Sequence, residues 1–567
     1  MNIFVNHIGY RPDDRKKAVI EGSQELEKTE IYVINRESGE TVYSGKPENT
    51  GSVDKWKNWN FLSFDFSRLK EKGHYFLLIN TAGKFIKSET FEIRENILSE
   101  KTLSDMLFYF KSMRSSGNYD NKDRTAGVFG SDEVRDVHGG WYDASGDMSK
   151  YLSHLSYANY MNPQQIPMVG WNLIDVLEDI KISGKLTGSE MHKRFEEEIL
   201  QGADFLMRMQ NESGFFYMTL FDQWSKELDR RILCSYTGQE GTRWQSYEAA
   251  YRQGGGVTIA MLARTASLTI EGDYEPSEYL SAAIKGFDHL EENNLKYLDD
   301  GKENIIDDYC ALLAASELYK VTEEPRFYEA AEKRAINLIG RVRREGKFSG
   351  WLCADDGKRP YFHAAEAGLP VLSLIRFLEC SPSVSGEVKT RVLKAVEEIM
   401  KFELAITSEV NNPFGYARQY TKGDNSEAAS AFFVPHNNPS KYWWQGENAR
   451  LASLSSAALK TKRLFSADRD FSVKLKNYAL DQINWIVGCN PYNMSMLQGH
   501  GANNPFYEKD YINNPGGVAN GITSGFSDEH DIDFAPPELA ELGDHSWRWG
   551  EQWIPHAGWL MQAIALL

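Results

Sequence analysis

Cysteine is scarce in this sequence. Its 567 residues include only five cysteines, an odd number, and no two of them form a C-x-x-C pair. This spacing argues against a zinc knuckle and against a disulfide framework. Free thiols are typical of a reducing compartment, so we expect a cytoplasmic protein.

The sequence also lacks long apolar runs and an excess of positive charge. No run of about 18 apolar residues occurs, so we expect no membrane span. Residues 1–7 carry neither the basic nor the apolar region of a signal peptide, and we expect none. The net charge of -18 disfavours nucleic acid or an anionic membrane as a partner. It is compatible with a neutral or cationic substrate.

Motifs of several other enzyme classes are missing. The sequence has no Walker A loop, no H-E-x-x-H and no G-x-S-x-G elbow. An acidic run at residues 528–533 offers oxygen ligands that suit calcium. We interpret this run as a solvated loop, with calcium binding as the alternative. We therefore predict neither a cofactor nor a metal.

The hydrophobic pattern divides the chain into two parts. Residues 1–96 contain short alternating segments at 17–20, 29–34 and 74–79, separated by turn residues. Several short strands within about 95 residues suggest a small immunoglobulin-like β-sandwich. Residues 97–567 change to spacings of three and four, which predict amphipathic helices.

About twelve helical segments follow one another in the second part. We expect them to begin near residues 101, 171, 190, 256, 277, 304, 325, 368, 386, 442, 468 and 551. Without interleaved strands, they predict six helical hairpins closed into an (α/α)6 barrel, so the fold class is mainly α. An open solenoid is the alternative, but the sequence shows no fixed repeat. The long loops between helices should gather at one end and form the site.

Two aspartates in a glycine-rich stretch are the first candidates for chemistry. Asp143 and Asp147 lie four residues apart within residues 138–147, directly after Trp141 and Tyr142. Two carboxylates on one tight loop can hold and deprotonate a water molecule. The aromatic pair offers flat apolar surface for a sugar ring. A turn with solvated aspartates and a buried tryptophan is the structural alternative.

A distant glutamate completes a carboxylate pair. Glu551 lies among Trp547, Trp549 and Trp553, and an apolar setting raises the pKa of a carboxyl group. A raised pKa suits a general acid near neutral pH. A glutamate in the first turn of the last helix, stabilised by the helix dipole, is the alternative. One aspartate loop and one separate glutamate together suit glycoside hydrolysis.

Further residues are candidates for substrate binding. Glu447 follows Trp443 and could pair with a sugar amine, although it could also be a helix-start glutamate above buried tryptophans. His363 lies in a loop before a helix, where a structural role is the alternative. The complete predicted set of substrate-binding residues is Trp141, Tyr142, His363, Trp443, Glu447 and Trp549.

These motifs together resemble glycoside hydrolase family 9, which includes many cellulases. The family's G-G-W-Y-D-A-G-D loop is matched by residues 139–147 with one extra residue, Ser145. Residues 550–559 are similar to its C-terminal signature around the acid, and residues 482–491 to its helix ending in G-x-N-P. Asp528 and Asp531 match an acidic stretch before that signature, and residues 6–10 resemble the opening of the immunoglobulin-like domain of some members.

The resemblance implies an inverting mechanism and assigns roles. Asp147 would be the general base, Asp143 its helper in holding the water, and Glu551 the general acid. The inserted Ser145 leaves the division of roles between the two aspartates open. The His-His-Arg cluster of the family's cellulases is missing after residues 499–505, so some cellulase contacts to the sugar should be missing too.

Residues 143–160 are similar to the exo-β-D-glucosaminidases of this family, which act in bacterial chitin breakdown. The sequence therefore predicts an inverting exo-β-D-glucosaminidase that acts on small chitosan- or chitin-derived oligosaccharides. A β-glucosidase or cellulase of the same family is the first alternative. A carbohydrate-binding protein on an inactive barrel is the second, and the retained Asp143, Asp147 and Glu551 argue against it.

Overall fold

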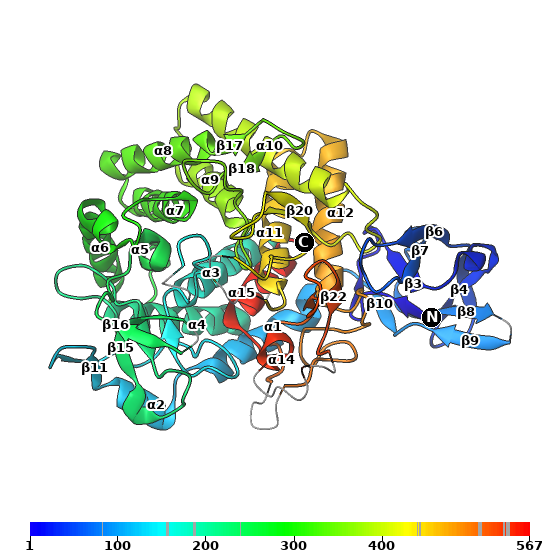
Figure 1. Cartoon of the computed structure of the whole chain (residues 1–567), viewed down its shortest axis with the longest axis horizontal. Helices are drawn as coiled ribbons and strands as arrows, with labels where there is room; N and C mark the ends of the chain where they lie inside the picture. The colour runs from blue at the N-terminus through cyan, green and yellow to red at the C-terminus, as the bar shows by residue number, and fades with distance from the viewer. Residues whose placement is uncertain are drawn as a thin grey trace.

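A small β-sandwich projects from the side of a large helical domain in the computed structural model (Figure 1). The structure describes all residues except 82, 155–157, 185–188, 239, 439, 441–443, 508–512, 537–538 and 540–544. Among the described residues, no helix combines the length and apolarity needed to cross a bilayer.

Two sheets form the sandwich. The first has the order β1-β3-β7-β6, and the second the order β2-β10-β8-β4-β5, with β9 paired to β8. Alternate residues of β8, such as Tyr75, Leu77 and Ile79, are buried in the core between the sheets. The strands are β1 (Asn2–Phe4), β2 (Gly9–Tyr10), β3 (Lys17–Glu21), β4 (Ile31–Asn35), β5 (Thr41–Gly45), β6 (Glu48–Ser52), β7 (Asn60–Asp65), β8 (Gly73–Thr81), β9 (Lys84–Lys87) and β10 (Phe91–Ile93). The predicted sandwich is confirmed.

Twelve long helices of the described chain form the second domain. Six inner helices contact one another in sequence, and the last contacts the first, so the ring closes. These are α3 (Ile166–Ser183), α5 (Gly255–Ser267), α7 (Ile305–Thr322), α9 (Leu369–Cys380), α11 (Asn448–Leu464) and α15 (Ile554–Leu566). The outer helices are α1 (Ile97–Met113), α4 (Ser189–Arg208), α6 (Pro276–Tyr297), α8 (Pro325–Gly340), α10 (Gly386–Thr407) and α12 (Arg469–Ile486). The predicted (α/α)6 barrel is confirmed.

The burial of each ring follows from its sequence. Helix α15 contains no charged residue and is buried along its length up to Leu566. Outer helix α4 is charged on one face and buries Phe195, Ile199 and Leu206 on the other, as the spacing predicts. Proline in the first turn begins several of the twelve helices, including α6 and α8.

Short strands lie on the loops at the N-terminal end of the inner ring, where we predicted loops alone. They form a sheet of order β12-β11-β15-β14-β13, with β16 paired to β15. Its strands have two to six residues, too short for alternation to stand out in the sequence. They are β11 (Ala126–Val128), β12 (Val134–Arg135), β13 (Lys150–Tyr151), β14 (Thr219–Phe221), β15 (Ile232–Thr237) and β16 (Thr242–Trp244). Three two-stranded ribbons are β17 (Val342–Arg343) with β18 (Trp351–Leu352), β19 (Gln419–Thr421) with β20 (Ala429–Ala431), and β21 (Thr523–Ser524) with β22 (Ile532–Asp533).

A buried ion network joins the inner helices in their C-terminal halves. Arg264 of α5 contacts Asp175 of α3 at 2.9 Å, and Arg376 of α9 contacts Glu317 of α7 at 2.8 Å. Lys460 of α11 lies 3.1 Å from Asp175. We call these five residues the basal ion network. Burial opposes ionisation of both carboxyl groups, but the cations outweigh it and hold the pKa values of Asp175 and Glu317 below their ordinary range.

Candidate active site

The aspartate loop is held by glycines and by a buried lysine. Gly139 and Gly140 have φ values of 83° and 71°, and a Cβ on Gly140 would lie 2.7 Å from the ring of Phe205. Only glycine adopts this conformation in so little space without strain. Lys150 follows the loop, and its Nζ donates to the carbonyls of Val137 and Gly139, both at 2.8 Å. These bonds connect the end of the loop to its beginning.

The inserted Ser145 connects the aspartate loop to the segment that carries Glu551. The amide of Gln552 donates to Ser145 Oγ at 3.0 Å, and the amide of Ser145 donates to the carbonyl of Gln552 at 2.9 Å. The amide of Ile554 donates to the carbonyl of Asp143 at 3.1 Å. These bonds bring together residues about 400 positions apart in the chain.

The two aspartates have different hydrogen-bond partners. Asp147 accepts from the hydroxyl of Tyr151 at 2.7 Å, from Trp224 Nε1 at 3.1 Å and from the amide of Ser149 at 2.8 Å. Asp143 accepts from Trp553 Nε1, at 3.1 and 3.2 Å from its two oxygens. Both are buried, and burial raises both pKa values. Because three donors favour its charged form, Asp147 ionises more readily than Asp143.

Glu551 lies between α14 (Trp547–Gly550) and α15, and it is partly exposed. The last helix, α15, begins at Ile554, three residues later than we predicted. The carboxyl group of Glu551 approaches Gly146 so closely that a Cβ there would lie 2.6 Å from its Oε1. Burial, and then the charge of Asp147, raise the pKa of Glu551 to about 8. The group is therefore protonated at neutral pH, as a general acid must be.

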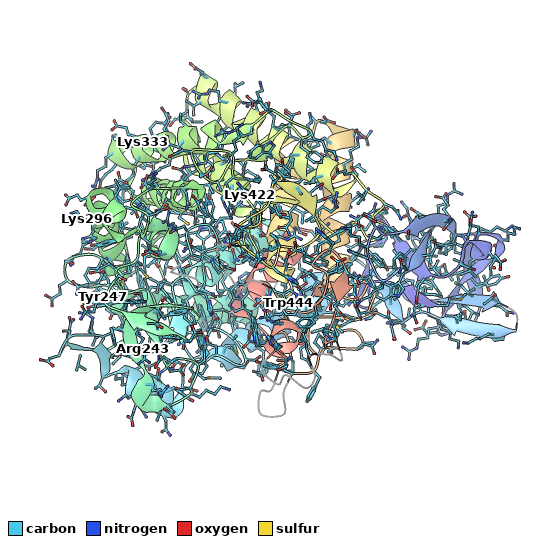
Figure 2. All side chains as sticks on the ribbon, in the orientation of Figure 1. Arg243, Tyr247, Lys296, Lys333, Lys422 and Trp444 are labelled. Atoms are coloured by element: carbon cyan, nitrogen blue, oxygen red, sulfur yellow. The ribbon has the colours of Figure 1, made fainter. Side chains whose placement is uncertain are left out.

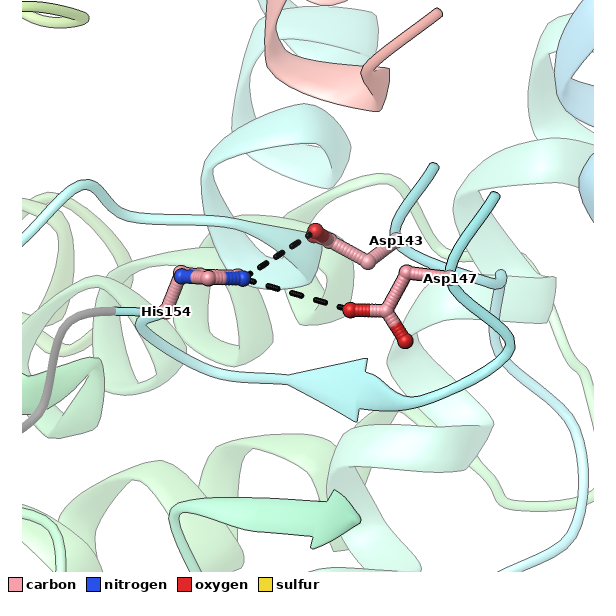
Figure 3. A group of neighbouring side chains, drawn as sticks. All are labelled: Asp143, Asp147 and His154. Carbon is pink, nitrogen blue, oxygen red and sulfur yellow. Dashed lines mark ion pairs between the residues drawn. The ribbon is translucent and has the colours of Figure 1, made fainter. Parts of the chain in front are cut away.

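His154 lies beside both aspartates, although no sequence motif marked it as a site residue. Figure 3 shows its Nε2 directed between Asp143 and Asp147, 3.8 and 3.9 Å from their nearest oxygens. Burial lowers the pKa of His154 to about 4, so its ring is neutral near pH 7. Donor atoms of these three residues lie within 4.8 Å of one another, which makes them the described group best placed to hold a metal ion.

The structure contradicts the prediction that Trp141 and Tyr142 form an exposed sugar platform. Trp141 is completely buried, and its Nε1 donates to Glu198 at 3.2 Å. Tyr142 is 8% exposed, and its hydroxyl accepts from the amide of Ser116 at 3.1 Å. Both rings therefore pack inside the protein, where they support the aspartate loop.

Glu447 is also not available to a sugar amine, contrary to the prediction. It is buried at the start of α11 and pairs with Arg450 at 2.5 Å. Its oxygens also accept from Gln419 Nε2 at 3.1 Å and from the amide of Val434 at 2.8 Å. The structural alternative, a helix-start glutamate, describes this residue correctly.

His363 likewise has a structural place. It is 1% exposed, and its Nδ1 accepts from the amides of Ala365 and Glu366, both at 3.1 Å. This buried side chain stabilises the turn before α9, which favours the structural alternative over the predicted substrate contact.

The tryptophans near Glu551 differ in exposure. Trp549 is 3% exposed, whereas Trp444 is partly exposed. The ring centroid of Trp444 lies 6.1 Å from that of Trp549 and 5.4 Å from that of Phe526, on which it stacks. Figure 2 places Trp444 close to the C-terminal helices. Trp444 is therefore the better candidate for a sugar contact. The predicted contact Trp443 lies outside the described residues.

The acidic run at residues 528–533 is used for a domain contact. Asp531 and Asp533 lie 3.5 and 3.2 Å from Nζ of Lys57, which belongs to the sandwich. Asp528 is exposed, but the pairing of Asp531 and Asp533 with Lys57 makes the loop less solvated than we predicted.

Comparisons with known proteins agree with this arrangement. Residues 100–510 match the family described as glycosyl hydrolase family 9, and residues 1–84 match the cellulase N-terminal ig-like domain. The first match includes Asp143 and Asp147 and ends before Glu551.

Three similar proteins illustrate the relationship. Endoglucanase D of Acetivibrio thermocellus is 22% identical over an alignment of 541 residues, and the match covers 91% of this chain and 76% of the relative. The crystal structure of a metagenome-derived family 9 endoglucanase has a TM-score of 0.67 at 16% identity, covering 100% of this chain and 98% of the other. Endoglucanase J30 has a TM-score of 0.66 at 17% identity, covering 98% and 99%. At such identities the structures show a shared fold.

Proposed function

The chain belongs to glycosyl hydrolase family 9, a family of inverting enzymes, and we propose that it hydrolyses β-glucosidic bonds in gluco-oligosaccharides. The proposal rests on one observation. Asp143 and Asp147 lie beside Glu551, whose pKa of about 8 keeps it protonated near neutral pH. The similar proteins named above are endoglucanases, which favours glucose as the sugar.

The proposed mechanism assigns one role to each carboxyl group. Asp147 removes a proton from water, which attacks the anomeric carbon opposite the leaving group. Asp143 holds the same water, and Glu551 donates its proton to the glycosidic oxygen as the bond breaks. Inversion requires space for the water, so the carboxyl groups of Asp147 and Glu551 should lie about 6.5–9.5 Å apart.

Glucosamine, which was the main prediction from the sequence, is the second candidate sugar. Glu447 is excluded as its amine partner because Arg450 already pairs with it. We call Asp143, Asp147 and Glu551 the acid cluster. This cluster supports glucosamine, because Asp143 is buried and its two carboxyl neighbours raise its pKa further. A sugar ammonium next to Asp143 would offset that repulsion.

Matched substrates distinguish the two candidates. Aryl β-glycosides of glucose, glucosamine and N-acetylglucosamine differ only at the 2-position, and we expect the highest kcat/KM on glucose. Cello-oligosaccharides should release α-anomeric ends first, as detected by NMR. A preference for glucosamine would replace the glucan proposal with the second candidate. A β-anomer as first product would reject the inverting mechanism.

A reducing compartment is also part of the proposal. All five cysteines lie within the described residues, and each is buried and unpaired. Alkylation of the denatured protein without reductant should modify all five thiols. A disulfide in protein isolated from its native source would contradict the cytoplasmic location.

A further inference from the structure

Side chains of Asp143, Asp147 and His154 bring three possible ligand atoms close together. Asp143 Oδ2 and Asp147 Oδ2 lie 3.8 and 3.9 Å from His154 Nε2. Figure 3 shows both carboxylates on one side of the imidazole edge. The proposed reaction uses the two aspartates but gives the imidazole no role.

The hydrogen bonds of Tyr236 determine which imidazole nitrogen carries the proton. Its hydroxyl donates to the backbone carbonyl of His154 at 2.6 Å, since a carbonyl can only accept. The same hydroxyl oxygen lies 3.2 Å from His154 Nδ1. Nδ1 must therefore be the donor in that contact, so Nε2, which faces the two carboxylates, is the ring nitrogen that a cation can bind.

The three side chains are close enough for one cation to contact all of them. Their facing atoms lie within 4.8 Å of one another. A divalent cation is attracted to all three at once. Three protein ligands with one remaining water position are typical of mononuclear zinc sites.

We propose that Asp143, Asp147 and His154 form a reversible site for a zinc-like divalent cation, which displaces the hydrolytic water and inhibits the enzyme. One nitrogen and two oxygen ligands suit zinc better than calcium or magnesium, which prefer oxygen alone. Bonds of about 2.0–2.1 Å place tetrahedral ligands about 3.4 Å apart, so each carboxylate needs to move about half an ångström closer to His154 Nε2.

The surroundings support ligation and access. Tyr236 orients the imidazole, while Tyr151 and Trp224 orient the Asp147 carboxylate, as outer partners of metal ligands commonly do. The His154 side chain is 23% exposed, which gives an ion an entry path. A bound cation would occupy the lone pair with which Asp147 must accept a proton, so hydrolysis would stop.

Calorimetry on the full chain tests the site without any substrate. Protein stripped with EDTA is titrated with zinc chloride, and we expect one saturable site per chain. His154→Gln should weaken zinc binding about a hundredfold, and Tyr236→Phe, which keeps the imidazole, about tenfold. Calcium chloride should show no saturable binding, and zinc should inhibit hydrolysis until EDTA is added.

His138→Gln is the matched control. His138 lies 2.6 Å from Asp136 at the surface and offers zinc an unrelated His–Asp pair. Zinc affinity should stay within about twofold of wild type in this variant. Absence of saturable binding, binding that both His154→Gln and Tyr236→Phe retain, or equal loss in His138→Gln would overturn the proposal. Zinc binding in an inactive protein would instead reject only the proposed hydrolysis.

Discussion

At one end of the inner helix ring, Asp175 and Glu317 face arginine and lysine, whereas at the other end Asp143 and Glu551 face further carboxyl groups. Asp175, Glu317 and Asp143 are buried and Glu551 is partly exposed. The pKa values of the first pair are lowered, and those of the second pair are raised. Burial together with a neighbouring carboxyl group raises the pKa, whereas a cation that outweighs the effect of burial lowers it.

This difference separates a structural role from a chemical one. The basal ion network joins five of the six inner helices, and removing one partner leaves a buried charge uncompensated. The acid cluster holds its groups near one another without that compensation, which costs stability but keeps a proton available for transfer. Variants at the two ends should therefore affect different measurements.

The largest effect is expected from Glu551→Gln. This change keeps the shape of the side chain and removes the transferable proton, so hydrolysis of an unactivated disaccharide should slow by about 10²–10⁴-fold. The unfolding midpoint should stay the same or rise, because the strained carboxyl group is gone. Steady-state kinetics and thermal unfolding measure both. Near-normal turnover would remove Glu551 from the acid role and the contrast with it.

Arg264→Met tests the opposite end. It leaves Asp175 without its arginine, and we expect a loss of about 3–5 kcal/mol in the free energy of unfolding in urea, with kcat retained in the folded fraction. Arg326→Met is the control, because Arg326 is exposed and its ion pairs are worth less than about 1 kcal/mol. Equal effects of the two variants would show that the basal ion network is not structural.

The pH dependence should separate the two ends in opposite directions. The folded-state pKa of Glu551 is raised, so acid catalysis is present below about 8, and kcat/KM should fall about tenfold per pH unit above it. The folded-state pKa values of Asp175 and Glu317 are lowered, so their stabilisation is present above about pH 4 and lost as pH falls further. Kinetic profiles and urea unfolding across pH measure these limbs. A basic limb that persists unchanged in Glu551→Gln would assign it to another group.

The smallest effect concerns the orientation of Asp147. Trp224→Phe removes one of its three donors, and we expect kcat/KM to fall about tenfold. Trp244→Phe is the matched control, because Trp244 is exposed and donates to Thr237 instead. If the two variants have the same activity, Trp224 does not position the proposed base.

The sequence predicted the fold well because its evidence is local. Spacings of three and four mark the buried face of α4 and α10, and alternation marks β8, without knowledge of any partner. The strands β11 to β16 were missed because they are short and pair with segments far along the chain. The beginning of α15 was predicted too early. The helical spacing of the sequence includes Glu551, but the helix begins at Ile554, with Pro555 in its first turn.

The site was predicted less completely. Asp143, Asp147 and Glu551 stand in motifs that can be read from the chain, and the structure brings their segments together through Ser145. Trp224 carries no sequence signal for its role, because it reaches Asp147 from a loop 77 residues away with a φ of 56°. His154 followed the aspartate loop in sequence, but nothing local indicated which way its ring points.

The sequence by itself determined the two-domain order, the helical period and the presence of an acidic loop and a separate glutamate, because these depend on side-chain type and spacing along one segment. Only the tertiary structure decided which aromatic rings are covered, that Glu447 is paired with Arg450, and that His154 faces two carboxylates. Exposure, counter-charge and direction depend on atoms supplied by distant segments, and those atoms meet only when the ring of helices closes.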